Sequence, residues 1–421
     1  MSSDDSILII GAGLSGLAAG RELHRRNRPF RILEGSHRVG GRLGSMNVDG
    51  FACDLGFQVS MSNYTFLETL VPRKSLPRHP YVPGAIVWTG AERIRVADPR
   101  RTPLGAFQAV FRRLAGWRDL RAATRCRRAA ARARSGVDPS GSADQFIRDV
   151  GFSERFRESF LRPFFGGVFL DESLSVSAGR FLRTLDRFSN GSAELPRGGM
   201  QAIADAMAAP ILDRVEFGRT VDRLDPDSVI LDDGSRRGVA GVILAANRDT
   251  TTRLLHGDPV TGRDEEGQSH WSSTVAVHFE TPTATILEPI IVLNGSGSGR
   301  VNLVASSTAV ADGVAPAGRH SLTVSLRPDG PTELDDADLE GIGREAALMI
   351  GVESTNWRHL ATTPVRRALP TGPPPTTPPD SPDGVEIAGD WLGEPSIDTA
   401  VRSGIEAAAR LVESTPSGDR A

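Results

Sequence analysis

The stretch that decides the fold is SILIIGAGLSGLAAGRELHRR, residues 6–26. It opens with SILII, a continuous apolar run that is typical of a buried parallel strand. GAGLSG follows at once, and the next ten residues place Leu17, Ala18 and Leu23 on one face of a helix. FRILE (30–34) then has the pattern of a second strand. The stretch therefore predicts a βαβ unit.

Three glycines lie between the first strand and the helix, in the pattern GxGxxG. Gly11 permits a tight turn, Gly13 lets the backbone approach a pyrophosphate, and Gly16 allows close packing of helix on strand. Leu14 and Ser15 lie at the helix N-terminus, where free N–H groups and the positive end of the helix dipole attract phosphate. This arrangement predicts a dinucleotide site.

The residues after the second strand favour FAD over a nicotinamide dinucleotide. Glu34 lies eighteen residues beyond the last of the three glycines, where an acid accepts hydrogen bonds from ribose hydroxyls. Gly40 and Gly41 would let the following loop return over the pyrophosphate, and Arg38 or Arg42 would supply guanidinium donors to it. A nicotinamide enzyme has no particular need for such a loop.

The segment 34–45 resembles the second fingerprint of the flavin-containing amine oxidase superfamily, which includes monoamine oxidases, protoporphyrinogen oxidases and phytoene-type desaturases. DLGFQVS (54–60) is similar to a segment of that family whose backbone passes beside the flavin, which implies contacts from Gly56, Phe57 and Gln58.

Further segments extend the resemblance in the family order. PRGGM (196–200) resembles the entry into the second portion of the nucleotide domain. VDRL (221–224) resembles the strand whose backbone, at Val221, would hold the adenine, and GVILAAN (241–247) resembles the edge strand after it.

The C-terminal region carries the last of these motifs. EIAGDW (386–391) followed by SIDTAVRSGIEAA (396–408) resembles the family's final flavin motif. The resemblance implies that Asp390 binds the ribityl chain and that a helix N-terminus lies near flavin N1, where reduced flavin carries negative charge. The cofactor contacts implied here are Gly389, Asp390, Ile397, Asp398 and Ala400.

Several departures from the family bear on the chemistry. Lys74 is the only lysine, and it lies far in sequence from the sheet in which many amine oxidases carry a lysine near flavin N5. Tyr64 and Tyr81 are the only tyrosines, and Trp391 is either an aromatic wall of the substrate site or a packing residue. No cysteine lies near Asp390 in the sequence, so we expect the FAD to be noncovalent.

Composition narrows the classes of function that the sequence allows. The 421 residues carry a net charge of -3, which gives no global field for nucleic acid. No apolar run approaches the roughly 20 residues that span a bilayer. The two cysteines, Cys53 and Cys126, suit a reducing cytoplasm, and the eight histidines show no metal-ligand spacing, so no metal site is expected.

Residues 100–134 are rich in arginine. Apolar residues recur within this segment at helical spacing, which favours either a helix with a solvated basic face or weak contact with an anionic membrane surface or acidic substrate. These apolar residues are Phe107, Val110, Phe111, Leu114 and Trp117. RPFFGGVFLD (162–171) also resembles a segment of bacterial desaturase-like members, although aromatic packing in a core explains it equally.

The predicted fold is α/β: a Rossmann-like FAD-binding domain interrupted by helical and antiparallel-sheet insertions that form a substrate domain. Period-two alternation between 273 and 326 indicates the sheet, and prolines crowd the connector 370–382. The expected order is a first FAD-domain segment (1–75), a mainly helical insertion (76–190), a second FAD-domain segment (191–255), the antiparallel sheet (256–369) and a third FAD-domain segment (370–421).

The resulting prediction is an FAD-dependent oxidoreductase that transfers a hydride from an organic small molecule to flavin N5, with oxygen or an electron carrier as acceptor. The missing sheet lysine and the scarce tyrosines favour a desaturase-like or specialised-metabolism oxidase. An amine oxidase acting on carbon–nitrogen bonds, or a redox-neutral isomerase or flavin-binding scaffold, remains as an alternative. The sequence singles out no catalytic base.

Overall fold

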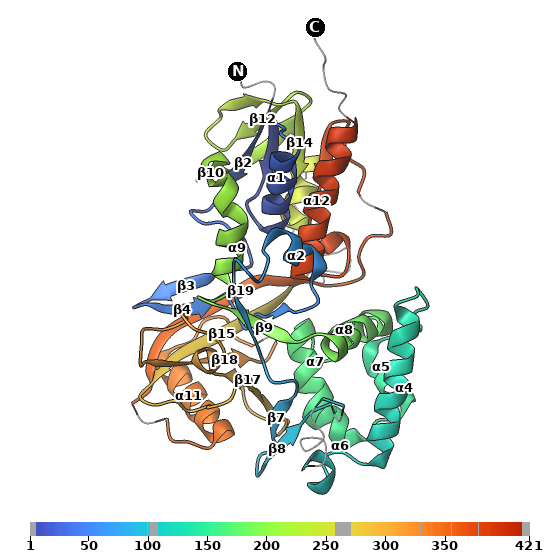
Figure 1. Ribbon diagram of the computed structural model, residues 1–421, viewed down its shortest axis with the longest axis vertical. Helices are drawn as coiled ribbons and strands as arrows, with labels where there is room; N and C mark the ends of the chain where they lie inside the picture. Colours follow the sequence, from blue (N-terminus) through green and yellow to red (C-terminus); the bar gives the residue numbers. More distant parts are fainter. Residues whose placement is uncertain are drawn as a thin grey trace.

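A computed structural model describes residues 6–98, 100–101, 108–256, 271–328, 330–354, 356–377 and 379–414. Figure 1 shows two lobes along the long axis, with both termini at the end of one of them. The lobe with the termini contains α1 and α12, and the other contains a broad sheet beside a group of helices. The chain crosses between the lobes several times.

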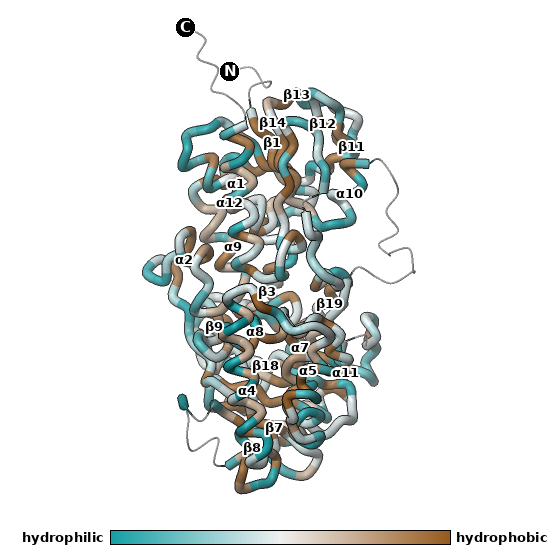
Figure 2. The backbone as a smooth tube through the Cα atoms, turned by 90° about the vertical axis from the view of Figure 1, so that its right-hand side faces the viewer, coloured by the Kyte–Doolittle hydropathy of each residue, from teal (hydrophilic) through white to brown (hydrophobic). Residues whose placement is uncertain are grey.

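A five-stranded parallel sheet forms the centre of the first lobe. All four residues of its central strand β1 are buried, which explains the continuous apolar run. Figure 2 shows β1 and β14 as apolar strands among more polar turns. The strand order is β10 (Val215–Phe217), β2 (Phe30–Glu34), β1 (Ile7–Ile10), β14 (Gly241–Leu244) and β20 (Val385–Ile387).

The position of β14 corrects one expectation. GVILAAN was expected to supply an edge strand, but β14 pairs with β1 on one side and with β20 on the other. The edge is β20, because the C-terminal segment returns to the sheet and covers β14. Strand order depends on pairings between distant segments, which the local pattern of β14 does not encode.

Two helices pack closely on this sheet. α1 (Leu14–Arg25) lies against α12 (Ile397–Ser414), and α9 (Gln201–Ala208) lies beside α1 (Figure 1). Gly404 of α12 makes this approach possible, because a Cβ there would overlap the carbonyl oxygen of Ser15. The helical tail predicted over residues 397–412 is confirmed.

A small antiparallel sheet and one further helix complete the first lobe. They are β11 (Val221–Asp225), β12 (Ser228–Leu231), β13 (Arg236–Gly238) and α10 (Arg248–His256).

The second lobe is built on a seven-stranded sheet with α11 (Asp336–Ile350) against it. The predicted antiparallel strands are present, and the turn at 294–299 joins an antiparallel pair. The strand order is β19 (Arg358–Pro370), β15 (Trp271–Thr281), β18 (His320–Leu326), β17 (Val301–Ala305), β16 (Ile291–Asn294), β7 (Ala85–Trp88) and β8 (Arg93–Val96).

This sheet differs from the expectation in two respects. Its last two strands come from the segment 76–190, which was expected to be mainly helical. One of them, β7, pairs with β16 in parallel, so the sheet is mixed rather than purely antiparallel. Short apolar runs such as AIVW become strands here because a distant segment offers them an edge.

Helices fill the rest of segment 76–190. α4 (Trp117–Ala133) begins after a turn in which Arg113 has φ 57°. The apolar pattern of residues 107–117 therefore does not continue into α4 as one helix. Phe107 lies outside the described residues. Phe111 and Trp117 are exposed. The other helices are α5 (Ala143–Val150), α6 (Glu154–Phe156), a π-helical turn (Arg157–Leu161), α7 (Arg162–Phe169) and α8 (Ala178–Asn190).

Short elements join the lobes. A hairpin and a three-stranded sheet lie between them (Figure 1). These elements are β3 (Ser45–Val48), β4 (Phe51–Asp54), β5 (Ser60–Met61), α2 (Thr65–Leu70), β6 (Arg78–Pro80) and β9 (Ala193–Pro196). Elsewhere, 3-10 turns span Ala209–Arg214, Ser307–Ala309 and Asp390–Leu392. Of the helices within the described ranges, none has the length and apolar content to span a bilayer.

Candidate active site

The N-terminus of α1 forms one end of a large cavity. Gly11 has φ 102°, which favours glycine, and a Cβ there would lie 2.8 Å from the Ala245 carbonyl oxygen. A Cβ on Gly16 would overlap the Gly11 carbonyl oxygen, so Gly16 permits the predicted close packing. Gly13 differs, because no described atom lies within 4 Å of where its Cβ would be. The open space beside Gly13 fits a pyrophosphate against the first amides of α1.

The loop after β2 returns over this helix end. Gly40 donates its N–H to the carbonyl oxygen of Ala12 (2.8 Å), and a Cβ on Gly41 would lie 3.3 Å from Gly13 Cα. Glu34 accepts the N–H of Ala12 at 2.7 Å and also lines the cavity. The paired glycines therefore let two backbone loops approach each other, as the sequence predicted.

The two arginines that flank this loop have different roles. The Arg38 guanidinium donates to the carbonyl oxygens of Val39, Leu43 and Gly41, the last at 2.6 Å, and it is not among the residues that line the cavity. Arg42 lines the cavity and pairs with Asp390 at 2.5 Å. Of the two predicted pyrophosphate donors, Arg42 lines the cavity, whereas the Arg38 guanidinium binds carbonyl oxygens of its own loop. Their contacts to a pyrophosphate stay predictions.

Gln58 lines the cavity and has one buried acceptor without a described partner. Its Nε2 donates to the carbonyl oxygens of Arg42 and Leu55, at 2.9 and 2.7 Å. Its Oε1 is buried without a hydrogen-bond partner among the described residues. An unpartnered buried acceptor is costly, so a ligand hydroxyl or N–H that binds it would be stabilised. Gly56 and Phe57 line the same region.

The C-terminal motif completes this half of the cavity. Gly389, Asp390, Ile397 and Ala400 line it, so α12 points its N-terminus into the cavity as predicted. Asp398 is used differently, because its carboxylate accepts the N–H of Leu67 at 3.0 Å and it is not a lining residue.

The adenine end was predicted at β11. Val221 lines the cavity, together with Leu14 and Ser15 from α1. The Val221 carbonyl oxygen accepts from the guanidinium of Arg253 at 3.0 Å.

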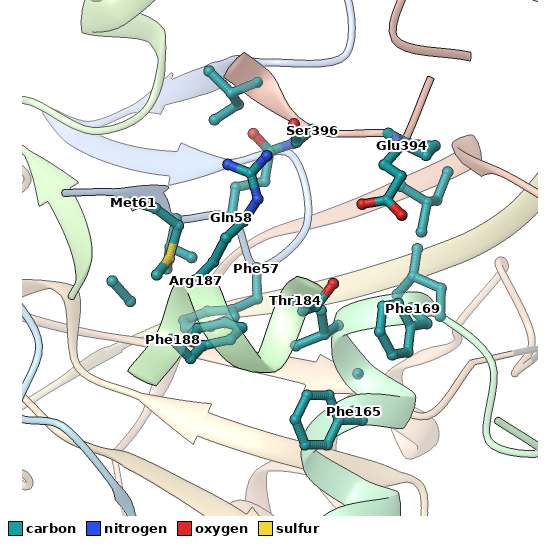
Figure 3. A pocket seen from close by; sticks show the side chains of 18 of the residues that line it. Phe57, Gln58, Met61, Phe165, Phe169, Thr184, Arg187, Phe188, Glu394 and Ser396 are labelled. Atoms are coloured by element: carbon teal, nitrogen blue, oxygen red, sulfur yellow. The ribbon is translucent and has the colours of Figure 1, made fainter. Parts of the chain in front are cut away.

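The other half of the cavity lies between the sheet of the second lobe and helices α7 and α8. Phe164 stacks on Phe160 (5.7 Å between ring centroids) and meets Phe188 edge-on at 5.2 Å. Phe165 and Phe169 continue the wall (Figure 3). The segment 162–171 therefore serves both as aromatic packing and as cavity lining. The whole cavity measures about 1560 Å³, above the 300–1,000 Å³ typical of one small-molecule site.

The family relationship spans nearly the whole chain. Residues 14–412 match the family described as flavin containing amine oxidoreductase. The chain belongs to this flavin-containing amine oxidoreductase family.

Individual relatives and solved structures differ in the activity that their names state. A putative flavin-containing monoamine oxidase of Mycobacterium tuberculosis is 29% identical over 286 residues, 63% of this chain and 62% of that protein. A segment of 58 residues is 41% identical to 4,4'-diapolycopene oxygenase from a Methylomonas species, covering 13% of this chain and 12% of that protein. Wild-type putrescine oxidase bound to putrescine superposes with a TM-score of 0.70 at 19% identity, covering 97% and 99% of the two chains.

The oxidoreductase has no lysine in its cavity. Lys74 is the only lysine of the chain, and its side chain is exposed and away from the cavity lining. Both tyrosines do line the cavity, which their distance from the C-terminal motif did not suggest. Tyr81 meets Phe57 edge-on at 6.1 Å, and Arg187 lies over the Tyr64 ring at 5.4 Å. Burial raises the pKa of Tyr64 to about 12, so this phenol keeps its proton.

Trp391 is placed as a packing residue in the oxidoreductase. It is buried, its indole Nε1 donates to the Ala246 carbonyl oxygen at 3.4 Å, and it is absent from the described residues that line the cavity. This geometry favours packing over the aromatic-wall role, which stays a prediction.

Sequence reasoning missed the polar residues of α8 that face the cavity. Arg180, Thr184 and Arg187 are spaced four and three residues apart, which places them on one helix face. The sequence signal for these residues is a set of arginines that recur along one face of a helix that also carries phenylalanines. Figure 3 shows Thr184 and Arg187 beside the aromatic wall, with the carboxylate of Glu394 facing the same space.

A buried polar pair supports the oxidoreductase cavity from behind. His278 Nε2 contacts the Asp54 carbonyl oxygen at 3.0 Å, and the Asp54 carboxylate accepts from Ser45 Oγ and the Met200 N–H. Burial raises the pKa of Asp54 to about 6 and lowers that of His278 to about 4. The described residues hold no cluster of three or more groups suited to a metal ion.

Proposed function

We propose that this protein binds FAD noncovalently and oxidises a largely apolar small molecule by hydride transfer, with carbon–carbon dehydrogenation favoured over carbon–nitrogen oxidation. The observation that carries the proposal is a single cavity that joins the glycine-rich end of α1 to an aromatic wall. A dinucleotide in the first half would place its ring toward the second half, where Phe164 and Phe188 line the space.

The residues of the first half fit FAD. Gly13 leaves space for the pyrophosphate, Arg42 supplies a guanidinium, and Gln58 Oε1 offers an unused acceptor. The α12 N-terminus would stabilise negative charge on reduced flavin. Noncovalent binding is supported by the cavity lining, which contains no histidine among the described residues and one cysteine, Cys126, whose pKa burial raises to about 12.

Bound FAD would supply a two-electron acceptor at N5. With FAD bound, dehydrogenation would transfer a hydride from one substrate atom to the flavin and release a proton from the neighbouring atom to solvent as the new double bond forms. The phenylalanine wall orients an apolar substrate and excludes water. Carbon–carbon dehydrogenation is supported by the absence of lysine from the cavity, and the relatives named as amine oxidases keep carbon–nitrogen oxidation as the alternative.

Anaerobic reduction of the reconstituted yellow protein tests the proposal. Polyenes and porphyrinogens form one panel, and primary and secondary amines form the other. Loss of the oxidised-flavin absorbance with the first panel alone is expected. Bleaching by amines alone would assign carbon–nitrogen oxidation, and a stoichiometric flavoprotein that neither panel reduces would contradict the oxidoreductase proposal. Reoxidation under air, compared with an artificial carrier, then identifies the acceptor.

A further inference from the structure

The charged side chains that line the half of the cavity between the second-lobe sheet and helices α7 and α8 differ in whether they already have a partner of opposite charge. The carboxylates that line this half each have partners already. Asp98 binds Arg100, and Asp119 accepts the N–H groups of Gly116 and Ser153. Glu394 lies beside the aromatic wall (Figure 3), and Arg183 binds it with an Nε–Oε1 distance of 2.5 Å. Arg183 is also held by Asp138 at 2.6 Å. An ammonium group entering the cavity would therefore meet a carboxylate whose charge is already neutralised.

Arg180 is in the opposite position. Its guanidinium lies over the Phe169 ring at 5.2 Å, and the described residues supply it with no hydrogen-bond or ion-pair partner. Arg180 lines the cavity, and burial lowers the pKa of its guanidinium. Arg180 is half-buried, so its guanidinium is partly desolvated while its donors have no described partner, and an anion that bound these donors would be stabilised.

The carboxylates near Arg180 are each used elsewhere. Asp390 is paired with Arg42, and Asp171 accepts from serine hydroxyls and amides of its own loop. Glu394 is paired with Arg183. These carboxylates favour the charge on Arg180 from a distance without binding its N–H groups.

A second cation lies on the same face of α8. Arg187 is two helical turns from Arg180, also lines the cavity, and packs its guanidinium over Tyr64 without a described acidic partner. Thr184 lies between them. The face thus presents planar guanidinium donors beside aromatic rings, an arrangement that suits an anionic oxygen group attached to an apolar body.

We propose that Arg180 is a substrate-binding residue that recognises an anionic oxygen group, a carboxylate or a phosphate, on the molecule whose apolar part lies along the phenylalanine wall. This inference rests on the proposed function and names its substrate class. A guanidinium forms two parallel hydrogen bonds to such a group, and the Arg180 and Arg187 guanidinium groups already lie over aromatic rings.

Binding to the oxidised FAD holoprotein tests the inference without requiring turnover. Isothermal titration calorimetry would compare 4-phenylbutyrate with three analogues that have the same apolar body: 4-phenylbutanamide, 4-phenylbutylamine and 4-phenylbutyl phosphate. We expect at least one anion to bind about 10- to 100-fold more tightly than the amide, the range that one or two charge-assisted hydrogen bonds supply. The tighter of the two anions identifies the head group.

Three variants assign the preference to Arg180. R180M should abolish the preference for the anion over the amide and leave the affinity for the amide nearly unchanged, whereas R180K should keep part of it. R128M, which removes an exposed arginine on α4, is the matched control and should change nothing. The FAD content and thermal unfolding of each variant show whether it is folded.

Several outcomes would overturn the inference. They are equal affinity for anion and amide, tighter binding of the amine, retention of the anion preference in R180M, or a loss of FAD from R180M that assigns the guanidinium to the cofactor. Anion binding that depends on Arg180 in a holoprotein that no substrate panel reduces would contradict the oxidation proposal alone. The two proposals can therefore fail separately.

Discussion

Gly13→Ala is expected to weaken FAD binding while leaving the apoprotein almost as stable as the wild type. Gly13 has φ -69° and ψ 177°, which alanine adopts without strain, and its added methyl group would meet no described atom within 4 Å. A compatible glycine-to-alanine change stabilises by about 0.4–1 kcal/mol, and the poorer N-cap offsets a few tenths of that. The free energy of unfolding should therefore change by less than about 1 kcal/mol.

The effect on the cofactor is larger. The methyl group would occupy the space through which a pyrophosphate reaches the α1 amides. Each lost hydrogen bond to a charged group costs about 1.5–3 kcal/mol, which corresponds to a rise in Kd of about 10- to 150-fold. Titration of FAD into apoprotein, followed by quenching of flavin fluorescence, measures this directly.

Gly404→Ala is the matched control, because it adds the same methyl group between two helices. Its Cβ would overlap the Ser15 carbonyl oxygen and lie 3.0 Å from Ala18 Cβ, so α1 and α12 must separate. Such overpacking typically costs about 1–3 kcal/mol, and the thermal unfolding of the apoprotein should report it. An unchanged FAD affinity in Gly13→Ala, or a loss of apoprotein stability as large as that of Gly404→Ala, would refute the assignment of this space to the pyrophosphate.

Three further predictions concern other regions of the molecule. The pKa of Asp54 is raised, so its contribution to the free energy of unfolding is complete below pH 4 and is lost as the pH rises to about 6. The pKa of His278 is lowered, so its contribution is complete above pH 6.5 and is lost as the pH falls toward 4. D54N should therefore steepen the loss of stability on acidification between pH 6 and 4, by up to about 3 kcal/mol, and H278Q should do the reverse; parallel denaturation curves for all three proteins would contradict this. Arg38→Ala should speed amide hydrogen exchange in residues 39–44, because three carbonyl oxygens of that loop lose their donor, and unchanged exchange would show that the loop needs no such support. Trp117 is 75% exposed on the arginine-rich helix α4. If this helix contacts an anionic membrane surface, Arg121→Glu should lower co-sedimentation with anionic vesicles about 5- to 30-fold. Equal binding before and after the change would contradict the membrane contact.

Much of the half of the cavity next to α1 was predictable, because the sequence motifs that form it are local. A βαβ unit with glycines at its turn is encoded within about thirty residues, since the backbone conformations and the close approach are properties of those positions. Gly13, Gly41 and the α12 N-terminus all line the cavity, and their contacts to a cofactor stay predictions. Arg38 shows a limit of such motifs: a donor next to a phosphate loop can equally bind the carbonyl oxygens of that loop, as the Arg38 guanidinium does, and composition does not distinguish the two.

The substrate half depends on pairings between distant residues. By itself the sequence predicted the glycine-rich βαβ unit and determined that the chain has a single lysine. Only the tertiary structure decided that β14 is internal, that β7 joins the second sheet in parallel, and that Arg183 rather than Arg180 receives Glu394. Electrostatic pairing acts over a few ångströms in space. The sequence therefore does not show which of Arg180 and Arg183 is paired, because the carboxylate that binds Arg183 lies some 210 residues later in the chain.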